Sequence, residues 1–289
     1  MNVQLRQLTS NDLPFCNKLI NQAGWNQTDK DWQRIMLLNP EGCFIARLNG
    51  TNVGTIAYTI FSQNPENMCS PVAWISMVLV DKKFRGQGIG QVMFSMVMRK
   101  LSDMEVGTVR LDATPMGLKI YSKFGFEKEY ELIRLIRDAA YPERSVSSLP
   151  KTGCDPMQLA WLDGKYTGTY RYPLIQALAD ELLTGIMHRR GEKDTVCGYV
   201  AWRPGRNAWQ IGPCIAEDPE QGNQLLGKAL EQLTGERVII DIPGVCSSTI
   251  QWAMDNHFVE QRRFVRMFFG RKIKDNPGHI LASFGPEKG

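Results

Sequence analysis

Residues 78–101 read VLVDKKFRGQGIGQVMFSMVMRKL: an apolar run typical of a strand, a turn with alternate glycines, and the apolar spacing of an amphipathic helix. Gly86, Gly88 and Gly90 leave out side chains where the strand turns into the helix, so several backbone N–H groups can face one spot. The helix dipole and Arg85 add positive charge there. The stretch predicts an anion-binding turn, with a flexible strand-to-helix connection as the alternative.

Two other phosphate-binding motifs fit this turn poorly. It lacks the Gly-Lys-Ser/Thr of a P-loop, and a dinucleotide-binding turn needs G-x-G-x-x-G. The five residues between Val80 and Gly86 are also too many for a dinucleotide-binding turn.

The composition bounds what else the chain can be. With 289 residues, 43% of them hydrophobic and 22% charged, it is long enough for two domains of an ordinary soluble protein. The net charge of +4 is too small and too evenly spread to predict a nucleic-acid surface. We interpret a basic cluster near the C-terminal end as a solvated face; it consists of Arg262, Arg263, Arg266, Arg271, Lys272 and Lys274.

The cysteines and histidines predict no special chemistry. Seven cysteines form no CxxC pair, and the histidines do not cluster, so we expect neither a disulfide framework nor a metal site. The N-terminus lacks an apolar signal core, and no apolar run reaches the ~20 residues that span a bilayer. We therefore expect a cytoplasmic protein that binds no membrane and no nucleic acid.

Around the opening stretch the sequence predicts an α/β fold with a mixed sheet. Two short helices come first, over residues 11–24 and 28–39, and the second begins with a capping box formed by Thr28 and Asp31. Apolar runs on both sides of Asn49-Gly50 predict a hairpin. Further strands are expected at 72–80, 108–114 and 130–137, and helices at 88–101 and around 118–123. The strand at 72–80 is apolar on both faces and hence central.

Two motifs in this half resemble those of the GNAT superfamily of acyl-CoA N-acyltransferases. Arg85, Gly88 and Gly90 fill the fixed places of its pyrophosphate loop, Gln/Arg-x-x-Gly-x-Gly/Ala. Tyr121 precedes Gly125-Phe126 at its Tyr-x-x-x-Gly-Phe spacing. The motifs occur in the order and register of that family.

The resemblance covers about residues 3–137 and implies a splayed sheet that binds acetyl-CoA as cosubstrate. Strand 73–80 would offer free backbone groups to pantetheine, and loop 85–90 would hold the pyrophosphate. The residues implied to bind acetyl-CoA are Val78, Leu79, Val80, Arg85, Gly86, Gln87, Gly88, Ile89 and Gly90.

The implied reaction is direct attack of an amine on the thioester in a ternary complex. Tyr121 is the candidate for protonating the departing thiolate, with a tyrosine of the core as the alternative, and a backbone N–H near Val78 would stabilise the oxyanion. The base stays open, because strand 72–80 has no carboxylate. It would be a water held by backbone carbonyls, or one of Asp29, Asp31 and Asp112.

The acceptor is expected to be a small-molecule primary amine. Trp25, in a polar loop between the first two helices, and Asp29 are the candidates for contacting it. Trp32 shares an apolar face with Ile35 and Met36, so we expect it in the core.

From about residue 141 the pattern changes. Residues 141–156 are rich in Pro, Ser and Gly and predict a linker between a catalytic domain, 1–140, and a second domain, 157–289. NAWQIGPCIAEDPEQGNQLLGKAL, residues 207–230, is similar to 72–94: Ala-Trp opens a strand, an acidic residue ends it and a helix follows. The second domain is therefore expected to repeat the first fold.

The loop of the second half does not repeat the chemistry. Glu217, Asp218 and Glu220 stand where a pyrophosphate site needs positive charge, and only Gly222 remains before the helix. AGWNQTDKDW, AWISMVLVD and LDATPMG in the first half further resemble a bacterial GNAT subgroup with a second, degenerate GNAT-like domain.

These features together predict a tandem N-acetyltransferase that is active in its N-terminal domain and that could form a homodimer. A catalytically silent acyl-CoA sensor and a protein-lysine acetyltransferase are the alternatives.

Overall fold

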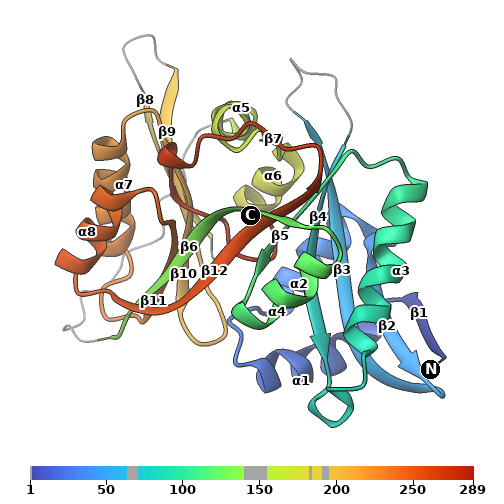
Figure 1. Ribbon diagram of the computed structural model, residues 1–289. Coiled ribbons are helices and arrows are strands. Elements are labelled where there is room, and N and C mark those ends of the chain that lie inside the picture. The colour runs from blue at the N-terminus through green and yellow to red at the C-terminus, as the bar shows by residue number, and fades with distance from the viewer. Residues whose placement is uncertain (1, 64–70, 140–154, 182–183, 191–194) are drawn as a thin grey trace.

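The structure, a computed structural model, describes residues 2–63, 71–139, 155–181, 184–190 and 195–289 (Figure 1). Residues 141–154 of the predicted linker lie outside the described residues. The α-helices are α1 (Leu13–Ala23), α2 (Asp29–Leu38), α3 (Ile89–Asp103), α4 (Pro115–Lys123), α5 (Pro156–Thr167), α6 (Tyr172–Asp180), α7 (Pro219–Glu231) and α8 (Ser247–Asp255). The strands are β1 (Val3–Gln7), β2 (Cys43–Leu48), β3 (Thr51–Gln63), β4 (Val72–Val80), β5 (Thr108–Ala113), β6 (Glu127–Arg137), β7 (Thr169–Tyr170), β8 (Gly185–Arg190), β9 (Val196–Arg203), β10 (Trp209–Ala216), β11 (Val238–Pro243), β12 (Val259–Gly270) and β13 (Ile280–Ala282).

The elements predicted for the first half are confirmed, with ends shifted by a few residues. The capping box of α2 forms, because the Asp31 carboxylate accepts a hydrogen bond from the backbone N–H of Thr28 at 2.8 Å. β1 was not predicted; it is a five-residue strand that pairs antiparallel with β2 at the edge of the sheet. An edge strand this short, with mixed polar and apolar residues, carries little periodic signal.

The strands of both halves form one continuous mixed sheet. Its order is β1-β2-β3-β4-β5-β12-β6-β11-β10-β9-β8. The two halves exchange their last long strands, since β12 from the second half pairs with β5 and β6 from the first half pairs with β11. Figure 1 shows β6 and β12 side by side through the middle of the molecule. The second half therefore repeats the fold of the first, as predicted, but shares a sheet with it.

Helices cover both faces of each half of the sheet. In the first half, α3 packs its apolar side on one face of the sheet through Met93, Phe94 and Val97. The other face is covered by α1 and α2, where Trp32 is fully buried, as expected. In the second half, Leu226 of α7 belongs to the cluster on one face, while α5 and α6 pack on the other.

Both halves of the sheet are splayed at equivalent places. The parallel ladder between β4 and β5 joins Val72–Trp74 to Thr108–Arg110, and beyond it the two strands separate. In the second half the ladder between β10 and β11 joins Trp209–Ile211 to Val238–Ile240. The splay predicted from the family resemblance is thus present, and it leaves one edge of β4 free.

In the described parts of the chain, no helix has both the length and the apolar character needed to cross a bilayer.

Candidate active site

The turn between β4 and α3 has the geometry that its glycines predict. Gly86 and Gly88 both have φ of +78°, a left-handed conformation that favours glycine, and Gly88 is the N-cap of α3. A Cβ built on either residue meets no described atom within 4 Å, so the space in front of the turn is open. Gly90 differs, because its Cβ would make an ordinary contact with Val80 at 3.7 Å. The backbone thus requires glycine at two of the three positions.

The other residues implied to bind acetyl-CoA lie along the same path. Arg85 is exposed, and its Nε donates a hydrogen bond to the carbonyl of Val80 at 2.9 Å, which holds the guanidinium at the end of β4. Gln87 is exposed in the turn. The side chains of Leu79 and Ile89 are buried in the core, which leaves their backbone groups as the parts able to contact a ligand.

A β-bulge opens β4 where the splay begins. Ser76 pairs with Ala57 and Leu79 with Thr55, so Met77 and Val78 together lie opposite one residue of β3. Met77 has φ of +54°, and its carbonyl accepts a hydrogen bond from the Thr55 hydroxyl at 2.8 Å. The bulge therefore interrupts the β3–β4 ladder at Met77 and Val78.

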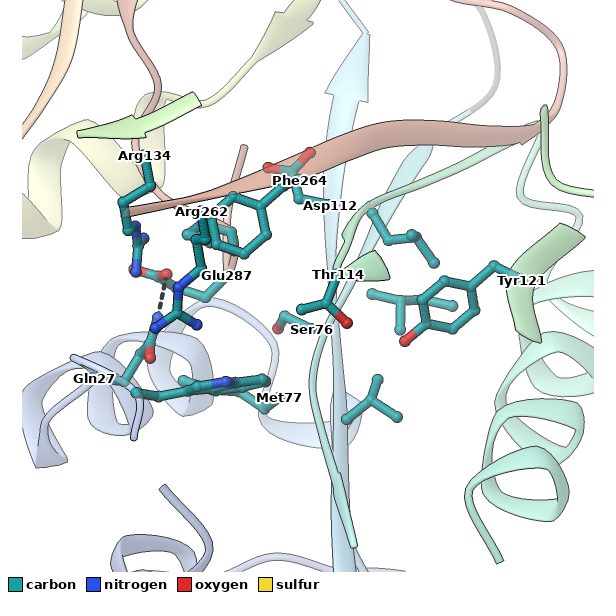
Figure 2. Close-up of a pocket in the computed structure, with 15 residues that line it drawn as sticks. Gln27, Ser76, Met77, Asp112, Thr114, Tyr121, Arg134, Arg262, Phe264 and Glu287 are labelled. Atoms are coloured by element: carbon teal, nitrogen blue, oxygen red, sulfur yellow. Dashed lines mark hydrogen bonds between the residues drawn. The ribbon is translucent and has the colours of Figure 1, made fainter. Parts of the chain in front are cut away.

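A pocket lies in the gap between β4 and β5, with an empty volume of ≈ 630 Å³. Both halves of the chain line it (Figure 2), and the lining residues are Trp25, Gln27, Ile75, Ser76, Met77, Val78, Leu111, Asp112, Thr114, Tyr121, Arg134, Arg262, Phe264, Pro286 and Glu287. The structure therefore brings Trp25, Val78 and Tyr121 to one cavity. It does not bring Asp29 there: Asp29 begins α2 and accepts a hydrogen bond from Asn17 at 2.5 Å.

Tyr121 lies on α4 with its hydroxyl toward the pocket (Figure 2). Its ring packs on Phe94, with ring centroids 4.8 Å apart, and on Phe126 at 6.1 Å. Burial raises the pKa of the phenol to about 12. Within the described residues its hydroxyl has no hydrogen-bond partner. The aromatic cluster thus holds a protonated phenol in the pocket wall.

The two carboxylates of the pocket are both held by arginines. Asp112 accepts two hydrogen bonds from Arg266, at 2.9 and 3.0 Å. Glu287 accepts from Arg203 at 2.7 Å and from Gln27 at 2.9 Å. Burial raises the pKa of Asp112 although Arg266 opposes it, whereas Lys288 and Arg203 hold the pKa of Glu287 below its usual value against the effect of burial.

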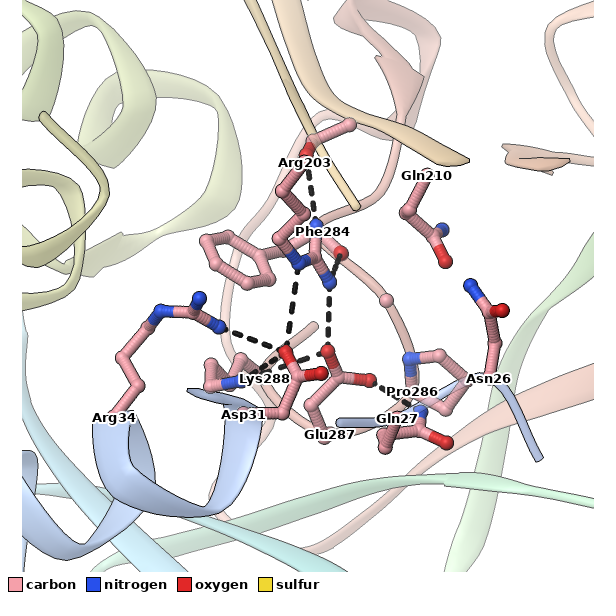
Figure 3. A network of polar contacts seen from close by, with 12 residues as sticks. Asn26, Gln27, Asp31, Arg34, Arg203, Gln210, Phe284, Pro286, Glu287 and Lys288 are labelled. Carbon is pink, nitrogen blue, oxygen red and sulfur yellow. Dashed lines mark hydrogen bonds and ion pairs between the residues drawn. The ribbon is translucent and has the colours of Figure 1, made fainter. Parts of the chain in front are cut away.

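Asp31 lies outside the pocket in a buried network of charged groups (Figure 3). It caps α2 and is bonded to Arg34 at 2.8 Å. Lys288 and Arg203 lie near it, at 3.7 and 3.6 Å. Although burial opposes them, these cations hold the pKa of Asp31 well below its usual range. The network fastens the segment 283–289 of the second half onto the first.

The interpretation of the C-terminal basic cluster as a solvated face was wrong for two residues. Arg266 is buried against Asp112 with its guanidinium 4.7 Å from the ring centroid of Trp74, and Arg262 lines the pocket. The reason is that β12 lies between β5 and β6 in the middle of the sheet. Strand alternation, which places residues 262, 264 and 266 on one face, is the signal that could have separated them from the exposed Arg263.

The equivalent gap in the second half is filled by the chain itself. β13 pairs with β10 through Cys214 and Ile215, and the N–H of Ser283 donates to the carbonyl of Asp241 on β11 at 2.8 Å. A Cβ on Gly222 of α7 would lie 2.8 Å from Leu281. The gap between β10 and β11 therefore holds a strand where the first half has a pocket.

The described residues contain no group of three side chains that could together hold a metal ion.

Comparisons with known proteins agree with this arrangement. The model of the acetyltransferase (GNAT) family matches residues 5–126, and that of an acetyltransferase (GNAT) domain matches residues 160–282. A holothin acyltransferase from Pseudoalteromonas sp. (strain SANK 73390) is 25% identical over 271 residues, which cover 92% of this chain and 87% of that protein.

Two solved structures share the fold. A candidate acetyltransferase from Pyrococcus horikoshii has a TM-score of 0.80 at 23% identity and covers 99% of this chain and 96% of its own. A tandem GNAT protein from the clavulanic acid biosynthesis pathway has a TM-score of 0.63 at 14% identity. The match covers 95% of this chain and 100% of that protein's chain. Since the two family models match most of the chain, one in each half, the protein belongs to the GNAT superfamily as an acyltransferase with two GNAT domains in tandem.

Proposed function

We propose that this enzyme transfers acetyl from acetyl-CoA to the primary amine of a small metabolite, by direct attack in a ternary complex. The observation that carries the proposal is the single pocket in which the free edge of β4, the Tyr121 hydroxyl and side chains of the second half meet.

The residues of the first half fit acetyl-CoA. The open space in front of Gly86 and Gly88, at the N-terminus of the fifteen-residue helix α3, suits the pyrophosphate. The unpaired edge of β4 suits the amides of pantetheine, which would continue the sheet as an added strand. This path leads from the turn to the pocket, so the thioester would lie beside Tyr121.

The chemistry then follows from the groups in the pocket. The amine nitrogen forms a bond to the thioester carbonyl carbon, the C–S bond breaks, and the sulfur leaves with the electron pair. Tyr121 donates its proton to that sulfur, and a backbone N–H near Val78 stabilises the oxyanion. The proton of the attacking amine leaves through water held by backbone carbonyls, and Tyr121 is reprotonated from the same water. The products are an N-acetyl amide and CoA thiol.

A panel of primary amines and amino acids tests the proposal. We expect release of free CoA, detected with a thiol reagent, that depends on both acetyl-CoA and at least one amine. Binding of acetyl-CoA without thiol release across the panel would favour the silent sensor. Release with lysine-containing peptides alone would favour a protein-lysine acetyltransferase.

A further inference from the structure

The wall of the pocket contains an arginine that has no acidic partner among the described residues. Arg262 of β12 is partly buried, and neither a hydrogen bond nor an ion pair satisfies its guanidinium there. Asp241 is close enough to raise the pKa of Arg262, but its carboxylate is already bound by other side chains. Both oxygens of Asp241 accept hydrogen bonds from Arg134, at 2.7 Å each, and Gln210 donates to it at 3.1 Å.

The other arginines around the pocket are all matched. Arg134 binds Asp241, Arg266 binds Asp112, and Arg203 binds Glu287. An unmatched guanidinium in a partly buried site is costly, because burial removes water from five N–H donors. Burial and the neighbouring Arg134 accordingly lower the pKa of Arg262. An anion that enters the pocket would remove this cost.

Arg262 and Tyr121 lie on opposite sides of the pocket (Figure 2). The hydroxyls of Ser76 and Thr114 lie between them. Within the described residues, Ser76 Oγ has no hydrogen-bond partner, and neither has Gln27 Oε1. The guanidinium of Arg262 thus lies across the pocket from the tyrosine expected to face the thioester.

We propose that the acceptor is an amine that carries a carboxylate, and that Arg262 binds this carboxylate while the amine lies toward Tyr121. The inference rests on the proposed acetyl transfer and names the class of its acceptor. A guanidinium binds a carboxylate through two parallel N–H···O bonds, which fixes orientation as well as charge. One unpaired guanidinium balances one negative charge, which suits a carboxylate rather than a phosphate dianion.

The test compares matched acceptors in matched variants. Each amino acid of the panel is paired with its primary amide, which has the same shape and no negative charge. We expect the unaltered enzyme to favour the acids in kcat/KM by about 10–100-fold, since a hydrogen bond to a charged group contributes roughly 1.5–3 kcal/mol. Arg262→Gln should remove that preference, and Arg262→Lys should keep part of it. Arg263→Gln is the control, because Arg263 is exposed on the opposite face of β12 and binds Glu260 and Glu131.

Each outcome decides one of the two proposals. The carboxylate site would be overturned if Arg262→Gln lowered kcat/KM equally for acids and amides. It would also be overturned if the unaltered enzyme preferred amides or phosphorylated amines. Release of CoA with neutral amines alone would also overturn the carboxylate site, but it would support acetyl transfer. If no amine releases CoA, the acetyl transfer fails, and calorimetry with N-acetyl amino acids and their amides then decides the carboxylate site. Binding of the acids that Arg262→Gln abolishes would support it, and absence of binding would overturn it.

Discussion

Tyr121 has the two properties that a proton donor in this site needs. The phenol stays protonated across the neutral range because burial raises its pKa to about 12, and the ring cannot turn away because Phe94 and Phe126 pack on it. The burial that disfavours the phenolate also disfavours the thiolate that leaves the thioester, so the phenol proton can pass to the sulfur as the C–S bond breaks.

Replacing Tyr121 separates catalysis from packing. Tyr121→Phe keeps the ring contacts and removes the proton, so kcat should fall by about 10²–10⁴-fold, while the acetyl-CoA affinity changes by only a few fold. Steady-state kinetics and calorimetric titration measure the two quantities. Tyr170→Phe, outside the pocket, controls for loss of a tyrosine hydroxyl. A near-normal kcat with a lower melting temperature would show that Tyr121 only packs in the core and does not donate a proton.

Single residues differ in how far the sequence can place them. Tyr121 and Gly88 were found because each belongs to a local motif with fixed spacing. The expectation that Arg262 lies on a solvated face was wrong, because its surroundings depend on the pairing of β12 with β5, which is more than a hundred residues away in the chain. Glu287 could not be predicted as a lining residue, because nothing local in the sequence indicates that residues 283–289 reach the pocket. The motifs of the site could be predicted, whereas its charge balance depends on tertiary structure.

At the scale of elements, the turn between β4 and α3 depends on backbone shape. Two residues with φ of +78° direct the chain so that the N-terminus of α3 faces open space. The helices and strands around it could be predicted because apolar periodicity, capping residues and the Asn49-Gly50 turn all act locally. The exchange of β6 and β12 could not be predicted, because the hydrophobic pattern of each strand is compatible with pairing in either half of the sheet.

The turn can be tested with a pair of substitutions matched in backbone strain. Gly88→Asp adds a carboxylate at the expected pyrophosphate site and should weaken acetyl-CoA binding by about 2 kcal/mol or more. Gly50 has φ of +82° in the hairpin between β2 and β3, and its Cβ would meet only the Arg47 guanidinium, at 3.8 Å. Gly50→Asp should therefore lower stability without changing acetyl-CoA affinity. Equal affinities in the two folded variants, measured by calorimetry, would contradict the assignment of the turn.

At the scale of the whole molecule, a buried charge network joins the halves (Figure 3). Lys288 is fully buried, and its Nζ lies 3.5 Å from Glu287 and 3.7 Å from Asp31. Burial lowers the pKa of Lys288 to about 8, from an ordinary value of 10.5. Between those two values the unfolded chain binds more protons at this position than the folded chain does. The contribution of Lys288 to stability must therefore rise with pH in that window.

The expected rise in the stability contribution of Lys288 can be measured by denaturant unfolding from pH 7 to 10. The free energy of unfolding of the unaltered protein, minus that of Lys288→Met, should rise by about 2 kcal/mol between pH 8 and pH 10. Taking the difference cancels the buried cysteines and tyrosines, whose raised pKa values lower stability as pH rises past their ordinary values. A difference that stays flat, or falls, over this range would contradict the placement of Lys288 in the network.

The two halves share a fold, yet we expect them to differ in coenzyme binding for two separate physical reasons. Glu217 and Asp218 lie directly before α7 and Glu220 lies in its first turn, so all three repel a pyrophosphate there, and Asp218 already caps the helix. Independently, β13 occupies the edge of β10 that a pantetheine arm would need. One acetyl-CoA should therefore bind per chain, measured by titration with a non-hydrolysable analogue.

The paired variant Glu217→Gln, Glu220→Gln separates these two reasons. If β13 fills the gap, removing the negative charges should leave the stoichiometry near one, because Leu281 still packs against α7 at Gly222. A stoichiometry near two in the unaltered chain would show that the second site binds coenzyme, contrary to both arguments. A rise from one to two in the paired variant alone would mean that charge excludes the coenzyme and that β13 can leave the gap.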